Sequence, residues 1–358
     1  MTQSLRQKLI LFLITFLVLS ALLIGMTAYL DPWFLYHAPR KGWYYRLSNE
    51  RCQSTGVARY FDYDALIVGS SLIRDNRTSR FDELYDTHSV KLPISGATWR
   101  ETGEVLQAAF ESGNPIRMVV RPLDVNHLIE DKEWVRWDLG EYPYYLYDNN
   151  PWNDVRYLCN RDILLDYCLP MIRERFSGTP GGHTSFDSYG LAHSAGGYVP
   201  APEDIGLPAD PQLPFTQEDA DLLTENLTAN LFRYVDAHPD TEFYLYLPTY
   251  GVVWWSEMQG DGTFERTMDA TALAVDLMLS RPNIRLYCYG DRFDLTDDLT
   301  QYTDEIHYSE GIAHQMLEWM ARGEGRLTQG NAKEVLERIR IHYREVDYES
   351  LRHRLIRN

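Results

Sequence analysis

The chain has 358 residues, 44% of them apolar, which is enough for one large domain or two small ones with a substantial core. With 52 acidic and 34 basic residues its net charge is −18, and this excess of acid argues against a nucleic-acid partner. The four cysteines include no Cys-x-x-Cys pair, so zinc and thioredoxin-like chemistry have no support, although Cys159 and Cys168 could pair in an oxidising compartment.

An uncharged apolar run, Leu9–Leu30, follows the two cations Arg6 and Lys8. The run is long enough to span a bilayer and longer than the roughly 7 to 15 apolar residues of a cleavable signal peptide. We therefore expect residues 1–30 to be an uncleaved signal anchor of a single-pass plasma-membrane protein. Because cations before a span favour the cytoplasm, the N-terminus should be cytoplasmic and the chain after Asp31 extracytoplasmic.

After a juxtamembrane segment at 31–60, short and mostly apolar runs recur between turn residues. These runs are Ala65–Val68, Val90–Ile94, Met118–Val120, Phe243–Leu247 and Ile284–Tyr289. Helix-like stretches such as Glu101–Glu111 and Glu218–Asp236 lie between several of them. The alternation predicts a doubly wound α/β domain with a central, mostly parallel five-stranded sheet.

Two stretches do not follow this alternation. Residues 129–217 are rich in aromatic residues and proline, so we expect an insertion over the edge or mouth of the sheet. Residues 326–358 are charged, and Asn331–Arg354 is helical in pattern, so we expect a solvated terminal helix.

The first predicted strand is followed by Gly69, Ser70, Ser71 and Leu72. Ligands in open α/β sheets bind beyond the carboxyl ends of the strands. A serine on a tight strand-to-helix turn can expose its hydroxyl there and place backbone N–H groups near a developing oxyanion, and we expect the glycine to supply the turn. Serine is also a favoured helix cap, so this block alone equally fits a capped turn.

A nucleophilic serine needs a histidine to take its proton and a carboxylate to orient that histidine. Asp304 lies three residues before His307, after the last predicted strand. A second pair with the same spacing, Asp124 and His127, follows the third strand and remains an alternative acid–base pair.

These blocks resemble those of the SGNH (GDSL-like) hydrolase superfamily over roughly residues 61–325. That superfamily carries its nucleophile in a Gly-Asp-Ser-Leu block and its acid and base in Asp-x-x-His. The likeness is closer to membrane-anchored bacterial cell-envelope members, which include the D-alanine transfer protein of teichoic acid synthesis and the alginate acetylation proteins. The resemblance implies a three-layer α/β/α flavodoxin-like fold, with Ser71 as nucleophile, His307 as base and Asp304 as the orienting acid.

The resemblance also implies further residues of the site. Gly96 in "ISGATW" and Asn126 in "LDVNH" would complete the oxyanion hole, although the Gly-x-Asn-Asp block of the superfamily then has both its glycine and its aspartate replaced. Ser70 is the alternative nucleophile if the turn is shifted by one residue. Arg74 and Arg121, near strand ends, could meet an anionic substrate such as a polyol phosphate.

The expected function is that of a membrane-anchored extracytoplasmic serine acyl esterase or acyltransferase. It would act through an acyl-serine on an acylated cell-envelope polysaccharide or a teichoic-acid-like polymer, with a membrane acyltransferase as a possible partner. The alternative is a non-catalytic scaffold or binding protein of the same fold. Aromatic side chains from Tyr142 to Trp152 and at Trp254–Trp255 could stack on sugars or simply pack. No motif for a metal or nucleotide is present, so we expect no cofactor.

Overall fold

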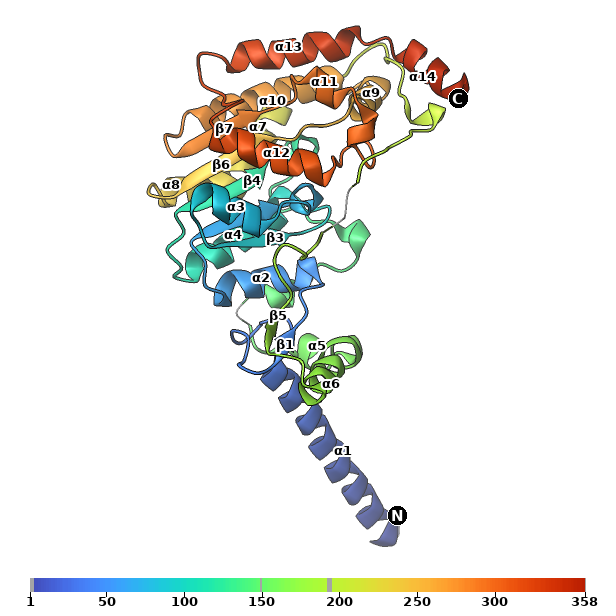
Figure 1. Ribbon diagram of the computed structural model, residues 1–358. Helices are drawn as coiled ribbons and strands as arrows, with labels where there is room; N and C mark the ends of the chain where they lie inside the picture. Colours follow the sequence, from blue (N-terminus) through green and yellow to red (C-terminus); the bar gives the residue numbers. More distant parts are fainter. Residues whose placement is uncertain (1–2, 149, 192–194, 358) are drawn as a thin grey trace. The chain divides into compact units, whose positions relative to one another are not determined.

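The computed structural model describes residues 3–148, 150–191 and 195–357 (Figure 1). The chain divides into two compact units. The first consists of Met1–Phe61 and Pro143–Ser185, and the second of Asp62–Tyr142 and Phe186–Asn358. The insertion predicted over 129–217 therefore contributes to both units, and it includes residues 149 and 192–194, which lie outside the described residues.

The first unit begins with α1 (Gln3–Leu30), a helix that is long and apolar enough to cross a membrane. Its stretch Leu5–Leu30 has a mean hydropathy of 2.9, and most of its side chains are exposed. The last turn differs, because Thr27 and Leu30 are buried where α1 packs on other elements of the same unit. The end of the apolar helix is thus part of a folded core.

Asp31, directly after α1, ties the following loop to this core. Its carboxylate accepts hydrogen bonds from the backbone N–H groups of Leu35, Tyr36 and His37. It also accepts one from the hydroxyl of Tyr157, at 2.8 Å. Burial raises the pKa of Asp31, although these hydrogen bonds favour its charged form.

The remaining elements of the first unit are short. Two two-residue strands, β1 and β5, pair in parallel. The elements are β1 (Tyr44–Tyr45), α2 (Glu50–Tyr60), α5 (Val155–Leu158), η5 (Ile163–Cys168), α6 (Leu169–Ser177) and β5 (Gly182–His183).

The second unit is an α/β domain built on a five-stranded parallel sheet, which confirms the predicted sheet. The strands lie in the order β3-β2-β4-β6-β7. They are β2 (Ala65–Gly69), β3 (Ser89–Pro93), β4 (Met118–Pro122), β6 (Glu242–Leu247) and β7 (Ile284–Cys288). Every residue of β2, β3 and β4 is buried, which explains why parallel strands read as nearly continuous apolar runs.

Helices connect and follow these strands. The helix expected over 218–236 is interrupted by a wider helical turn, Thr228–Phe232. The helices are α3 (Thr78–Tyr85), α4 (Trp99–Glu111), α7 (Gln217–Leu227), α8 (Arg233–Ala237), α9 (Val252–Gly260), α10 (Phe264–Leu279), α11 (Phe293–Thr296), α12 (Glu310–Ala321), α13 (Ala332–Glu345) and α14 (Tyr348–Arg357).

The C-terminal segment is less solvated than predicted. One face of α13 is buried, and it carries Val335, Leu336, Ile339 and Tyr343 at helical spacing. The Tyr343 hydroxyl donates to Thr296 Oγ1 at 2.6 Å, and its ring stacks on Trp255 with centroids 4.8 Å apart. The many charges of α13 lie on its other face, and they obscured this apolar stripe in the sequence.

We expect Tyr343→Ala to lower the free energy of unfolding by about 3 to 5 kcal/mol, because it leaves a cavity in a packed aromatic cluster. Ile341→Ala on the exposed face of the same helix should change it by less than about 0.5 kcal/mol. Chemical denaturation of both variants in detergent micelles tests this. Equal effects of the two substitutions would contradict the packing role of α13.

Candidate active site

Gly69 is the last residue of β2, and the neighbouring strand β4 packs closely against it. A Cβ atom there would lie 2.8 Å from the ring of Pro122, at the end of β4, and 3.1 Å from Ile73 Cγ2. The backbone of Gly69 does not have a positive φ. The turn therefore does not depend on a left-handed backbone conformation at Gly69. Glycine is required because the rigid proline ring leaves no room for a side chain.

The two serines after Gly69 have different partners. Ser71 opens a short helical turn, η1 (Ser71–Ile73), and Ser70 caps that turn. The Ser70 hydroxyl accepts a hydrogen bond from the Leu72 N–H at 3.4 Å and donates one to Asp124 Oδ1 at 2.8 Å. Ser70 is buried, whereas Ser71 is half-buried. The capping role falls to Ser70, and the Ser71 hydroxyl lies against the His307 ring.

His307 lies in a loop between β7 and α12 that is closed on itself. Tyr302 and Tyr308 form an isolated antiparallel bridge at its base. The Tyr302 hydroxyl donates to the carbonyl of Thr249 at 2.8 Å, so the loop is anchored to the segment that follows β6. The bridge between Tyr302 and Tyr308 and the hydrogen bond to Thr249 hold this loop, and with it the imidazole, in place.

A continuous chain of hydrogen bonds joins Ser71, His307 and Asp304. His307 Nε2 lies 2.6 Å from Ser71 Oγ, and His307 Nδ1 lies 2.6 Å from Asp304 Oδ2. A carboxylate at Nδ1 favours the tautomer with its proton on that nitrogen, and Nε2 can then accept the serine proton. The structure thus brings together the three side chains that the sequence proposed for one site.

The Asp304 carboxylate is also held by the backbone. Its Oδ1 atom accepts hydrogen bonds from the N–H groups of Ile306 at 3.0 Å and His307 at 2.7 Å. Burial works against ionisation, but the hydrogen bonds from His307 and Ile306 outweigh it and hold the pKa of Asp304 below its ordinary value. The group is therefore charged at neutral pH and can stabilise an imidazolium ion.

Asp124 is a residue of the site region whose partner the sequence did not indicate. Its carboxyl group accepts the Ser70 hydrogen bond, and its carbonyl accepts one from Trp99 Nε1 at 3.2 Å. Burial raises the pKa of Asp124, although the hydrogen bond from Ser70 opposes the shift. The sequence did show that Asp124 lies close after a central strand, which is a position typical of a site residue. Its spacing to His127, however, suggested that histidine as its partner.

The side chains of the second acid–base pair are not joined to each other by a hydrogen bond. His127 Nδ1 lies 2.9 Å from Glu130 Oε1, while the Asp124 carboxyl group binds Ser70. Burial opposes protonation of His127, but the Glu130 carboxylate and the charge of Asp124 raise its pKa. His127 and Asp124 therefore have different partners.

Gly96 and Asn126 lie where the chain leaves β3 and β4. Gly96 has a φ of +65°, a backbone conformation that favours glycine. Asn126 lies in η2 (Val125–His127) and is exposed. Their roles as oxyanion donors stay predictions.

Arg121 does not face a substrate, contrary to expectation. The residue is only 2% exposed. Its guanidinium donates to the carbonyl of Asn230 at 3.1 Å and to Thr102 Oγ1, and it lies 4.2 Å from the centroid of the Trp99 ring. Burial lowers its pKa to about 10. Arg121 is a core residue that links α4 and the helical turn after α7 to the sheet.

Arg74 is engaged within the second unit. Its Nε atom donates to the carbonyl of Gly190 at 2.6 Å, and its own carbonyl accepts a hydrogen bond from Lys91 Nζ at 2.6 Å. Arg74 therefore bridges the end of η1 to a distant loop. Its predicted contact with substrate stays a prediction.

A small pocket lies directly beside the Ser71 hydroxyl. It encloses about 170 Å³, its open mouth included, and is lined by Ser71, Leu72, Asp75, His307 and Tyr308. The buried Tyr308 hydroxyl donates to the carbonyl of Leu72 at 3.0 Å, which joins the histidine loop to the serine turn. Sequence reasoning missed this tyrosine, although it directly follows His307.

Carboxylates gather on one side of the histidine loop. Glu257 on α9 lies near Glu305, Asp204 and Asp261, and burial together with these charges raises its pKa to about 7. The pKa of Tyr198 is raised to about 12, first by burial and then by nearby carboxylates. This side of the loop is therefore unfavourable for further negative charge.

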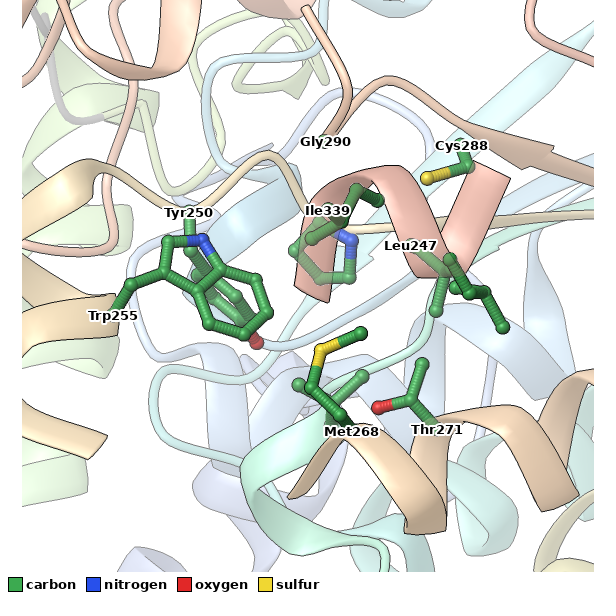
Figure 2. A pocket seen from close by; sticks show the side chains of 11 residues that line it. Leu247, Tyr250, Trp255, Met268, Thr271, Cys288, Gly290 and Ile339 are labelled. Atoms are coloured by element: carbon green, nitrogen blue, oxygen red, sulfur yellow. The ribbon is translucent and has the colours of Figure 1, made fainter. Parts of the chain in front are cut away.

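A separate apolar cavity lies beyond the carboxyl ends of β6 and β7. It encloses about 330 Å³, its mouth included, and Figure 2 shows Trp255, Met268 and Ile339 around it. None of Ser71, His307 and Asp304 lines this cavity. Trp254 and Trp255 are both buried, so they pack in the core and do not offer a surface for stacking sugars.

Within the described ranges no group of three or more His, Cys, Asp or Glu side chains is placed to hold a metal ion. All four cysteines are free thiols, so Cys159 and Cys168 are not paired in this structure. Compared with known proteins, the chain matches no family model and no curated protein. The family resemblance stays a prediction from the blocks of sequence.

We expect Glu257→Gln to stabilise the protein above about pH 7. The folded-state pKa of about 7 exceeds the ordinary value of 4.5, so the folded state binds the proton more tightly and stability is lost as the pH rises between these values. Glutamine removes this penalty, which solvent screening limits to about 1 kcal/mol. Thermal melts at about pH 8 should show the gain, and it should fade near pH 4.5.

The exposed Glu111 provides the matched control. Glu111→Gln should change the melting temperature by the same small amount at both pH values. A Glu257→Gln variant that is less stable than wild type at alkaline pH would contradict the raised pKa.

Proposed function

We propose that the protein is a serine acyl esterase or acyltransferase of the SGNH type. The observation that carries the proposal is the hydrogen-bonded chain from Ser71 through His307 to Asp304. The strand order adds support, because β3-β2-β4-β6-β7 is 2-1-3-4-5 when counted along the chain within the sheet, the order of flavodoxin-like folds. A three-layer α/β/α arrangement is part of this proposal.

In this mechanism the Ser71 oxygen attacks the carbonyl carbon of an ester while His307 Nε2 takes the hydroxyl proton. Asp304 stabilises the resulting imidazolium. The imidazolium then gives its proton to the departing alkoxide, and an acyl-serine remains. The oxygen of water or of a sugar hydroxyl then attacks the acyl-serine while His307 takes its proton, and His307 returns this proton to the departing Ser71 oxygen. The acceptor distinguishes the two activities, because an esterase uses water and a transferase uses the sugar hydroxyl.

The negative charge that develops on the ester oxygen needs hydrogen-bond donors. The backbone N–H groups of Ser71 and Gly96 and the side-chain amide of Asn126 are the proposed donors. A preorganised donor of this kind typically contributes about 2.7 to 4 kcal/mol to the transition state.

We place the catalytic domain outside the cytoplasm on a single-pass membrane anchor with a cytoplasmic N-terminus. Arg6 and Lys8 precede the apolar helix, which favours this orientation. Burial of Thr27 and Leu30 within the first unit supports an anchor that is retained, because removing it would leave a hole in that unit. The substrate class would be an acylated envelope polysaccharide or polyol-phosphate polymer, and a membrane acyltransferase is a possible donor of the acyl group.

The second candidate is a non-catalytic scaffold of the same fold in an envelope acylation or export complex. The observation that favours it is the small size of the pocket beside Ser71, which encloses about 170 Å³ with its mouth included. A binding role would preserve the fold without requiring room for a reacting ester.

We expect the full chain in detergent micelles to hydrolyse p-nitrophenyl acetate and to be labelled by a serine-directed fluorophosphonate. Ser71→Ala and His307→Ala should each reduce kcat by about 10³-fold or more, because triad members act as a unit. Ser70→Ala removes a buried cap and should reduce kcat by less than about tenfold. Mass spectrometry of the labelled peptide should place the adduct on Ser71.

The folded state of each variant is checked by its thermal melt. If the wild type is neither labelled nor faster than Ser71→Ala, the enzyme proposal fails and the scaffold is favoured. If labelling depends on Ser70 and His127 instead, the assignment of Ser71 and His307 is wrong.

A further inference from the structure

An apolar stripe runs along the exposed side of the helical segment 163–177 in the first unit. The stripe consists of Leu165 in the wider helical turn η5 and of Leu169, Ile172 and Phe176 in α6. The last three recur at intervals of three and four residues, which places them on one face of that α-helix. Leu165 is 43% exposed, Leu169 45% and Phe176 86%. The opposite side carries Ile163, Cys168 and Met171, which are buried. The segment therefore has one apolar face in the core of the unit and another without a partner in this structure.

The stripe is held beside the C-terminal end of α1. Both α5 and η5 pack against α1, and Figure 1 shows α5 and α6 next to this end of the helix. Thr27 and Cys168 are both buried in this unit, and the Trp33 and Tyr157 rings lie 5.5 Å apart. Because these contacts lie within one compact unit, the stripe and α1 form a single body.

The length of α1 places this end of the helix at a membrane surface. From Leu9 to Met26, before the buried turn, the helix is about 27 Å long at about 1.5 Å per residue. The hydrocarbon core of a bilayer is about 30 Å thick. The boundary between hydrocarbon and headgroups therefore falls close to the point where η5 meets α1.

Several exposed residues of the first unit suit a membrane interface. Arg156, Arg161 and Arg173 are exposed, and so is Asp166. Trp152, in the same unit, is 88% exposed. Tryptophan and arginine are favoured at the headgroup level, where an aromatic ring lies at the boundary and a long cationic side chain reaches water.

We propose that residues 163–177 form an interfacial helix whose apolar stripe lies in the outer surface of the lipid bilayer that α1 crosses. The proposal rests on α1 being a membrane anchor, as set out under the proposed function. The stripe would give the first unit a second contact with the lipid and would fix its tilt relative to α1.

The test uses the full chain reconstituted in vesicles, with an environment-sensitive fluorophore on single cysteines. Cys159 and Cys52 are replaced by serine, and Leu165→Cys, Phe176→Cys, Leu17→Cys and Ile341→Cys are labelled in turn. Lipids brominated along the acyl chain should quench the labels at 165 and 176 about twofold or more, as expected for groups in the acyl boundary. The label at 341, on an exposed apolar position outside the first unit, should not be quenched.

The label at position 17 separates the two proposals. Quenching at 17 without quenching at 165 or 176 would leave the anchor intact and overturn the interfacial helix. No quenching at 17 would overturn both. Blue-shifted emission at 176 that depends on protein concentration, without quenching by brominated lipid, would assign the stripe to a second copy of the chain and also overturn the proposal.

Discussion

The hydrogen bond between Ser71 and His307 joins residues that are 236 positions apart, and the candidate site depends on it. It can form because all five strands of the sheet run in the same direction, so the segments that leave them meet at one edge. The serine turn leaves β2, and the histidine loop is anchored to the segment that leaves β6 through Tyr302. The Tyr308 hydroxyl then joins the histidine loop to the serine turn, because it donates a hydrogen bond to the Leu72 carbonyl. The position of the imidazole thus depends on contacts with several segments at this edge of the sheet.

Two carboxyl groups near this edge have opposite electrostatic surroundings. Asp304 receives hydrogen bonds from an imidazole and from backbone N–H groups, so its pKa is low. Asp124 is dominated by burial, so its pKa is high. The two carboxyl groups also have different serine partners, because Ser70 binds Asp124 and Ser71 binds the histidine that Asp304 orients.

The apolar helix α1 and the candidate active site belong to different compact units. The first unit incorporates the last turn of α1 into its core through Thr27, Leu30 and the hydrogen bonds to Asp31. A helix whose end is built into a core has a fixed orientation relative to the elements packed on it, whereas a flexible linker would not fix that orientation. This gives a physical reason why segment 143–185, distant in sequence from α1, forms one unit with it.

The sequence by itself determined the apolar helix, the five strands and the choice of Ser71, Asp304 and His307 as candidate site residues. Hydrophobic periodicity and short-range spacing are local properties, so they can be recognised in a single sequence. It did not determine why Gly69 is glycine, since the Pro122 ring comes from another strand. It also left open whether Arg121 meets a substrate and whether Trp255 stacks on sugars or packs, and both side chains are buried. Only the tertiary structure decided which serine faces His307. That choice depends on the hydrogen bond between Ser70, which follows β2, and Asp124, which follows the neighbouring strand β4. A linear pattern carries no information about which side chains meet in space.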